Sequence, residues 1–105
     1  MPTKQLNGRA IEVTEEGFLV NPSDWSEDIA PLLAKEMGID NLTEAHWKVV
    51  RFMRNDFATK GQIPTIRRMK NEGGIPTKEL YELFPDGPSK KAAYVAGLGK
   101  PQGCV

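Results

Sequence analysis

An apolar stripe in the middle of the chain constrains the fold more than any other feature. Its members fall at positions i, i+3, i+4, i+7 and i+11, the spacing of one helix face: His46, Val49, Val50, Met53 and Phe57. Thr43 can cap the start of this helix, and Gly61 can end it. Because one apolar face of a long helix must be covered by other elements, the stripe predicts the centre of a helical core.

The segment before this helix begins with β structure. Asn7-Gly8 is a strong two-residue hairpin signal, and Ile11 and Val13 alternate with Glu12 as a half-buried strand does. A second turn at 15–17 and a third strand at 18–20 complete the pattern. Residues 4–20 therefore predict a small N-terminal β-meander.

Further helices are predicted on both sides of the central one. Asp24, with Glu27 three residues later, has the spacing of a capping box and predicts a helix that ends at Gly38. Three more helices are expected over 65–72, 78–84 and 89–96. The fold class is α+β and mostly α: the β-meander, a five-helix orthogonal bundle with a helix-turn-helix-like pair, and an extended C-terminal arm. Residues 1–97 are expected to form one globular domain, and 98–105 a flexible arm.

Composition limits the classes of protein that are possible. With 105 residues and 11.7 kDa, the chain can build one modest core. The sequence contains neither a run of about 20 apolar residues nor the apolar stretch of a signal peptide, so a cytoplasmic protein without direct membrane contact is expected. A single cysteine excludes an intramolecular disulfide and a multi-cysteine zinc site. No cofactor motif or metal-ligand cluster is evident, so no cofactor or metal is predicted.

Charge is distributed unevenly although the formal net charge is zero. Residues 12–44 hold nine acidic residues and one base, whereas residues 48–70 hold seven bases and one acid. Two interpretations stay open: a molecule with an acidic end and a basic patch, or two halves that neutralise each other in the fold.

A basic helix after a short turn offers one possible function. Thr65 to Lys70 follows the turn 61–64 as the second helix of a helix-turn-helix does, with Arg67 and Arg68 exposed to DNA in that hypothesis. The same layout is common in small helical proteins, so direct nucleic-acid binding is the weaker reading. His46 is better explained as a partly buried helix residue than as a ligand or catalytic base.

The tail offers another possible function, because the only cysteine is the penultimate residue. Cys104 follows Gly103 in a stretch without periodicity, where burial of a side chain is difficult, so its thiol is expected to be accessible. The neighbouring C-terminal carboxylate disfavours a thiolate, so a reactive Cys104 needs nearby cations. Lys100 lies in the tail itself, and the further candidates are Arg67, Arg68 and Lys70 if the tail folds back over the basic helix.

Several segments, in the same order along nearly the whole chain, carry a resemblance to one family: Asp24-Trp25, Thr43-Glu44, His46-Trp47, Ile63-Pro64 with Arg67, Leu80 to Pro88, Ala96-Gly97-Leu98 and Lys100 to Val105. They resemble the DsrC/TusE family, which includes the gamma-type partner of dissimilatory sulfite reductase and the TusE sulfur carrier of tRNA 2-thiouridine synthesis. The resemblance implies a mostly helical fold with a small β element and a mobile arm. It also implies that Cys104 carries sulfur as a persulfide between a donor and an acceptor protein.

The sequence departs from the family pattern at two positions. Sulfite-reductase partners in the family carry a second arm cysteine where this chain has Ala93, so the intramolecular disulfide of that cycle cannot form here. Gly99 replaces a proline, which is expected to loosen the arm. The prediction is a sulfurtransferase-type carrier rather than a self-contained enzyme, with Cys104 as the reactive residue and Lys100, Gly103, Arg67 and Arg68 in support. The alternatives are a gamma-type partner or regulatory subunit of sulfite reductase and, less favoured, a DNA-binding protein.

Overall fold

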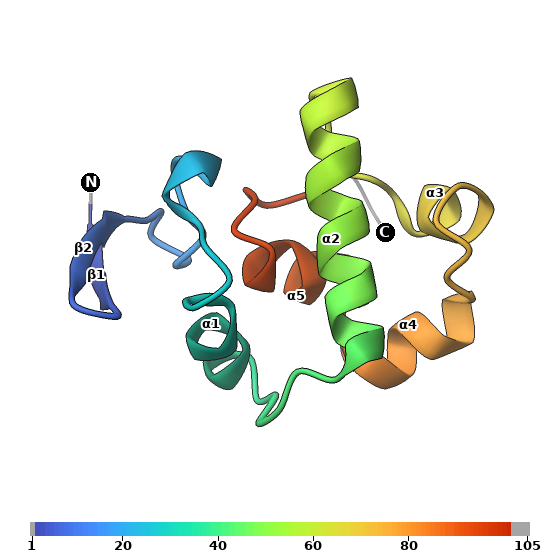
Figure 1. Cartoon of the computed structure of the whole chain (residues 1–105), viewed down its shortest axis with the longest axis horizontal. Coiled ribbons are helices and arrows are strands. Elements are labelled where there is room, and N and C mark those ends of the chain that lie inside the picture. Colours follow the sequence, from blue (N-terminus) through green and yellow to red (C-terminus); the bar gives the residue numbers. More distant parts are fainter. Residues whose placement is uncertain (1, 102–105) are drawn as a thin grey trace.

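A computed structural model describes residues 2–101. Its elements in chain order are β1 (Thr3–Leu6), β2 (Arg9–Glu12), the 3-10 helix η1 (Pro22–Asp24), α1 (Ala30–Glu36), α2 (Glu44–Lys60), α3 (Ile66–Asn71), α4 (Thr77–Leu83) and α5 (Pro88–Val95). The two-stranded hairpin lies at one end of the longest axis, and α3 and α4 lie at the other (Figure 1). The predicted fold class is confirmed: a small N-terminal β element and five α-helices.

The hairpin forms where Asn7-Gly8 predicts it. Both residues have positive φ, 52° and 80°, which is the backbone that a two-residue turn between twisted antiparallel strands requires. The third predicted strand is wrong, because 18–20 contributes only a single bridge between Val13 and Leu19. The Thr14 amide donates to the Phe18 carbonyl and the Val20 amide donates to the Glu12 carbonyl, so this segment meets the end of β2 at one bridge and does not form a full strand.

The prediction of an Asp24 helix cap is also wrong. Asp24 is the last residue of η1, and the side chain of Asn21 caps that short helix by accepting from the Ser23 amide. The chain is extended at Trp25, and α1 begins only at Ala30. The indole of Trp25 donates instead to the carbonyl of Val95, 70 residues away, so a tertiary contact replaces the helical continuation.

The central helix α2 agrees closely with its prediction. The Thr43 hydroxyl accepts from the His46 amide, and His46 Nδ1 accepts from the Thr43 amide at 3.1 Å, which together form a capping box. Gly61 ends the helix in the left-handed region, with φ 73°. His46 is buried, and its Nε2 lies 3.0 Å from the Leu83 carbonyl oxygen. Its burial agrees with the structural interpretation of this residue, and the imidazole also ties α2 to α4.

The core is built around α5, which lies between α1 and α2 (Figure 1). Its interior side chains are small or apolar and almost fully buried: Ala92, Ala93, Tyr94 and Val95. A second, smaller cluster joins the hairpin to α1 and meets Tyr94, whose ring packs edge-on against Phe18. The two clusters thus share the α5 helix, from which the chain leads into the C-terminal segment.

Candidate functional site

The backbone is held by several contacts just before the C-terminal segment begins. Gly97 follows α5 with φ 72°, and Leu98 is 1% exposed within the main core. Arg54 donates to the Ala96 carbonyl at 2.8 Å, and its guanidinium lies 4.2 Å from the centre of the Trp25 ring. Arg54, and Trp25 through its bond to the Val95 carbonyl, therefore hold the end of α5 a few residues before the chain reaches Lys100.

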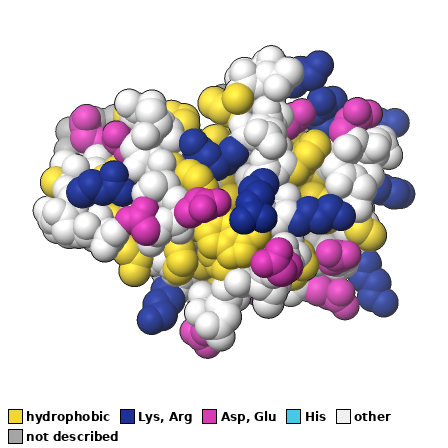
Figure 2. All heavy atoms as spheres, viewed as in Figure 1, with side chains coloured by type: hydrophobic (Ala, Val, Ile, Leu, Met, Phe, Trp, Pro, Cys, Tyr) yellow, Lys and Arg dark blue, Asp and Glu magenta, His cyan; other side chains and the backbone are white. Residues whose placement is uncertain are grey.

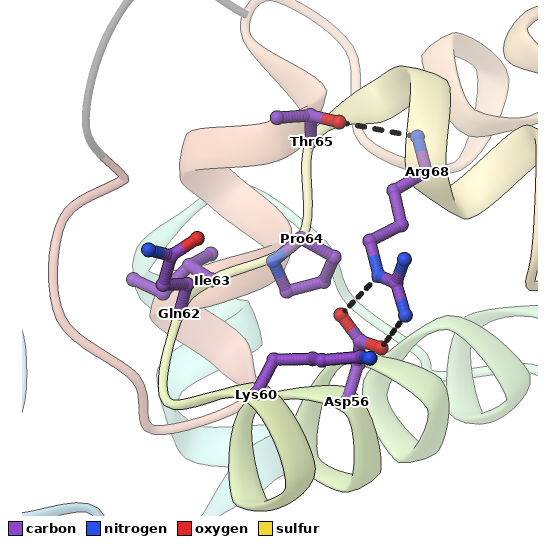
Figure 3. A pocket seen from close by; sticks show the side chains of 7 residues that line it. All are labelled: Asp56, Lys60, Gln62, Ile63, Pro64, Thr65 and Arg68. Carbon is purple, nitrogen blue, oxygen red and sulfur yellow. Dashed lines mark hydrogen bonds and ion pairs between the residues drawn. The ribbon is translucent and has the colours of Figure 1, made fainter.

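Near these contacts, the chain between α2 and α3 makes a tight corner. Thr65 accepts from the Arg68 amide and caps α3. Arg68 then reaches back to α2, where its Nε and Nη2 donate to the two carboxylate oxygens of Asp56 at 2.8 and 2.7 Å (Figure 3). This bidentate pair locks α3 against α2, and its hydrogen bonds hold the pKa of the buried Asp56 carboxyl below its usual range.

Two hollows lie side by side along this corner, and we call them together the α2–α3 groove. The first, of about 320 Å³, is lined by the residues drawn in Figure 3: Asp56, Lys60, Gln62, Ile63, Pro64, Thr65 and Arg68. The second, of about 480 Å³, shares Gln62, Ile63 and Thr65 with it and adds Phe57, Gly61 and Lys100. The C-terminal segment therefore borders the groove at Lys100.

Cations gather at the end of the molecule that holds the groove. In Figure 2, most of the dark blue side chains lie over the right-hand half of the view, where Figure 1 places α2, α3 and α4. Lys60 and Arg67 are exposed, and neither has a carboxylate within 4.0 Å in residues 2–101. Lys100 is partly offset, because its ammonium lies 3.2 Å from a Glu16 carboxylate oxygen. The basic patch is therefore real, although Arg68 and Lys100 already have acidic partners.

The sequence-predicted site residues fall into two groups. Lys100, Arg67 and Arg68 lie around the α2–α3 groove and its continuation along α3, where a further hollow is lined by both arginines and Thr65. Cys104 and Gly103 lie outside the described residues, so their position relative to these cations stays a prediction. Within the described part of the chain, no three side chains of the His, Cys, Asp and Glu types gather as a metal site would need.

Sequence reasoning missed the residues that organise this region. Asp56 was visible only as the one acid of a basic stretch, and Glu16 only as one of the nine acidic residues in 12–44. The roles of Trp25 and Arg54 carry no local signal, because their partners are 70 and 42 residues away. No helix in the described range is both long and apolar enough to cross a bilayer.

Comparison with known proteins decides the family. The family model described as DsrC like protein matches residues 5–105, which is nearly the whole chain. The chain belongs to the DsrC family. The DsrC match includes the corner that forms the groove, the segment that begins at Leu98, and the single cysteine.

Relatives of two kinds lie within the DsrC family. A sulfurtransferase TusE of Yersinia pseudotuberculosis is 42% identical, covering 96% of this chain and 99% of the relative. The gamma subunit of dissimilatory-type sulfite reductase from Nitratidesulfovibrio vulgaris is 38% identical, covering 93% of each chain. The sequence is thus similar to sulfur-relay proteins and to sulfite-reductase subunits at comparable levels.

Solved structures agree with this family placement. The crystal structure of dissimilatory sulfite reductase I (DsrI) superposes with a TM-score of 0.87 at 36% identity, over 98% of this chain and 99% of that one. The solution structure of the DsrC/gamma subunit from Pyrobaculum aerophilum gives 0.82 at 41% identity, over 98% and 94%. The DsrC fold therefore extends through the helices that form the groove.

Proposed function

We propose that this DsrC-family protein is a single-thiol sulfur carrier of the TusE type, with Cys104 as the residue that holds the sulfur. The observation that carries the proposal is the family match, which runs to residue 105 and therefore includes the only cysteine of the chain. Similarity to sulfurtransferase TusE at 42% identity over nearly the full length supports this role over a purely structural one.

The chemistry is a thiol exchange without net oxidation. The Cys104 thiolate attacks the outer sulfur of a donor protein's persulfide, a sulfur–sulfur bond forms, and the donor's cysteine thiolate leaves. Cys104 then holds a persulfide, whose outer sulfur is attacked by a nucleophilic thiolate of the acceptor. The Cys104 thiolate leaves in that second step and is ready for another cycle. The protein moves a sulfur atom between partners, so it acts as a carrier rather than as a self-contained enzyme.

The body of the protein suits a carrier because it provides a fixed base for the terminal segment. Leu98 is buried in the core, and Trp25 and Arg54 bond to the last carbonyls of α5. Three residues separate Lys100 from Cys104, and the four Cα–Cα steps between them span at most about 14 Å when extended. In this proposal Gly103 and Val105 offer little bulk to a narrow entrance in a partner.

Cations near the terminal segment would favour the thiolate and persulfide forms of Cys104. Of the three supporting cations, Arg68 is already bound by Asp56 and Lys100 is offset by Glu16, so Arg67 has the charge least committed within residues 2–101. We expect Arg67→Gln and Lys100→Gln to slow alkylation of Cys104 by iodoacetamide near neutral pH. The matched control is Lys78→Gln, on the exposed side of α4.

The decisive experiment is mass spectrometry after incubation with a persulfide donor. We expect a gain of about 32 Da, the mass of one sulfur atom, on the wild-type protein, and no gain on Cys104→Ser. The adduct should disappear on reduction and should pass to an acceptor thiol. Equal gain of sulfur on Cys104→Ser would refute the proposal.

The second candidate function is that of a partner or regulatory subunit of dissimilatory sulfite reductase. Similarity to the gamma subunit at 38% identity favours it. Ala93 weakens the version with an internal disulfide, because this chain has one cysteine and position 93 is fully buried in α5. This candidate predicts that co-purification with the reductase is unchanged in Cys104→Ser, whereas the carrier proposal predicts loss of sulfur transfer in the same variant.

A further inference from the structure

The α2–α3 groove lies where any protein that reacts with Cys104 has to approach. Lys100 lines the groove, and the chain from Lys100 to Cys104 spans at most about 14 Å. A partner whose reactive group meets the thiol therefore comes within that distance of the groove. This step rests on the proposed carrier function and adds the question of what the partner places there.

The groove combines apolar side chains with cations at its edges. Phe57 and Ile63 are half-buried and face the larger hollow, whose lining offers both polar and apolar contacts. Lys60 borders the smaller hollow, and Arg67 borders its continuation along α3. The one buried carboxylate in the groove, Asp56, is already neutralised by Arg68 through two hydrogen bonds. Glu72 also borders the hollow along α3, so the excess positive charge of the surface comes from Lys60 and Arg67 at the edges of the apolar side chains.

We propose that the α2–α3 groove is the docking surface for an acidic segment of the sulfur-transfer partner, one that carries an apolar side chain between carboxylates. The apolar side chain would lie against Phe57 and Ile63. The carboxylates would contact Lys60 and Arg67, neither of which has a carboxylate oxygen within 4.0 Å in residues 2–101, although the charge of Lys60 also acts on Asp56. Electrostatic complementarity of this kind mainly speeds encounter and selects the orientation, and here it would align the partner with the terminal segment.

Two other occupants are chemically conceivable, and each predicts a different result. A nucleic acid would use the same cations, but its affinity would not depend on the apolar floor. The chain's own residues 102–105 are the other alternative, because they begin two positions after Lys100 in the sequence and include an apolar valine. The partner segment is favoured because delivery of sulfur requires a second protein at this location, and because the groove volume extends well past the border with Lys100.

The test is an amide chemical-shift titration of the full chain in the Cys104→Ser background. The probe is a capped hexapeptide of alternating glutamate and leucine, and its lysine–leucine counterpart and a single-stranded oligonucleotide serve for comparison. We expect only the acidic peptide to shift the amide resonances of residues 57–65. We expect Lys60→Ala and Arg67→Ala each to raise the Kd of this peptide about twofold to fivefold at low salt. Ile63→Ser should raise the Kd of the acidic peptide more than either of these two substitutions does.

The matched control is Lys35→Ala, because Lys35 is, like Lys60, an exposed lysine in the last turn of a helix. The Kd of the acidic peptide for the Lys35→Ala variant should equal its Kd for the parent protein. Equal shifts with the lysine peptide, or no groove shifts at millimolar acidic peptide, would overturn the proposal. Tighter binding of the oligonucleotide, insensitive to Ile63→Ser, would assign the groove to nucleic acid instead. Peptide binding that appears only after deletion of 102–105 would assign it to the chain's own terminus.

Failure of this test and failure of the carrier proposal are distinguishable. Binding is measured without the reactive thiol, and sulfur loading is measured by mass on the wild-type protein. A protein that gains one sulfur but ignores the acidic peptide would keep its carrier function and lose this docking surface.

Discussion

The guanidinium of Arg54 lies 4.2 Å from the ring centre of Trp25, and both side chains bond to carbonyls at the end of α5. Arg54 also donates to the Pro22 carbonyl at 3.2 Å, so it joins three segments that are distant in sequence. Burial lowers the pKa of Arg54 from its ordinary value, but an arginine remains charged at any physiological pH. These contacts fix the direction in which the chain leaves the core.

Arg54→Met should therefore destabilise the fold. Loss of two charge-assisted hydrogen bonds and one cation–π contact is expected to lower the free energy of unfolding by about 2–3 kcal/mol. Urea denaturation followed by circular dichroism would measure this change. Arg51→Met is the control, since Arg51 on the same helix is exposed and makes only a long ion pair, 3.8 Å from Glu27, and a longer cation–π contact, 5.5 Å from the centre of the Trp47 ring. A similar loss in both variants would contradict a special role for Arg54.

Gly97→Ala should disturb the packing of Trp25 against the end of α5. Gly97 has φ 72°, and an added Cβ would lie 2.3 Å from a carbon of the Trp25 ring. We expect a loss of about 2–4 kcal/mol from backbone strain and steric overlap together. Gly38→Ala separates the two causes, because Gly38 has φ 82° with open space around it, and its loss should be only about 1 kcal/mol. Thermal melting of both variants gives the comparison, and equal losses would argue against the Trp25 contact.

The Asp56–Arg68 pair should make stability depend on pH. The hydrogen bonds from Arg68 lower the pKa of Asp56 in the folded protein. The ionised Asp56 therefore contributes its full share to the free energy of unfolding above its unfolded-state pKa of about 4. That contribution is lost as the pH falls through the lower pKa that Asp56 has in the folded protein. The stability difference between wild type and Asp56→Asn should be large at about pH 6 and should shrink at about pH 3. Urea midpoints across that range measure it.

Asp40→Asn serves as the control for this titration. Asp40 is exposed and has no cationic partner within 4.0 Å in the described part of the chain. Its variant should reproduce the wild-type dependence on pH. An Asp56→Asn curve that runs parallel to the wild type at every pH would show that the pair does not stabilise the folded state.

Tyr94→Phe should loosen the attachment of the hairpin. The Tyr94 hydroxyl accepts from Lys4 at 2.6 Å and donates to Glu36, so one atom connects β1, α1 and α5. Its loss is expected to lower the free energy of unfolding by about 1 kcal/mol and to speed amide exchange in β1 and β2. Tyr81→Phe is the control, since Tyr81 is 49% exposed and should change stability by less than about 0.5 kcal/mol. Unchanged exchange in the hairpin would contradict the role given to Tyr94.

The features that could be predicted without a structure depend on residues close together in the chain. The α2 helix, its Thr43 cap and its Gly61 end follow from residues within one turn of one another, and so does the Asn7-Gly8 hairpin. The unusual tail with one penultimate cysteine, and the resemblance built around it, also belong to the sequence. Each of these features depends on neighbours in the chain, so no knowledge of the tertiary arrangement was needed.

Contacts between side chains far apart in the sequence could be identified only from the folded structure. Asp24 does not cap a helix because Trp25 is held by Val95, and Arg68 is not a free cation because Asp56 lies on the facing helix. The α2–α3 groove likewise has Lys100 on its border only because the chain returns there to a loop about 40 residues earlier. A hydrogen bond or ion pair between distant residues depends on the path of the whole backbone, and the free energy of packing the core sets that path.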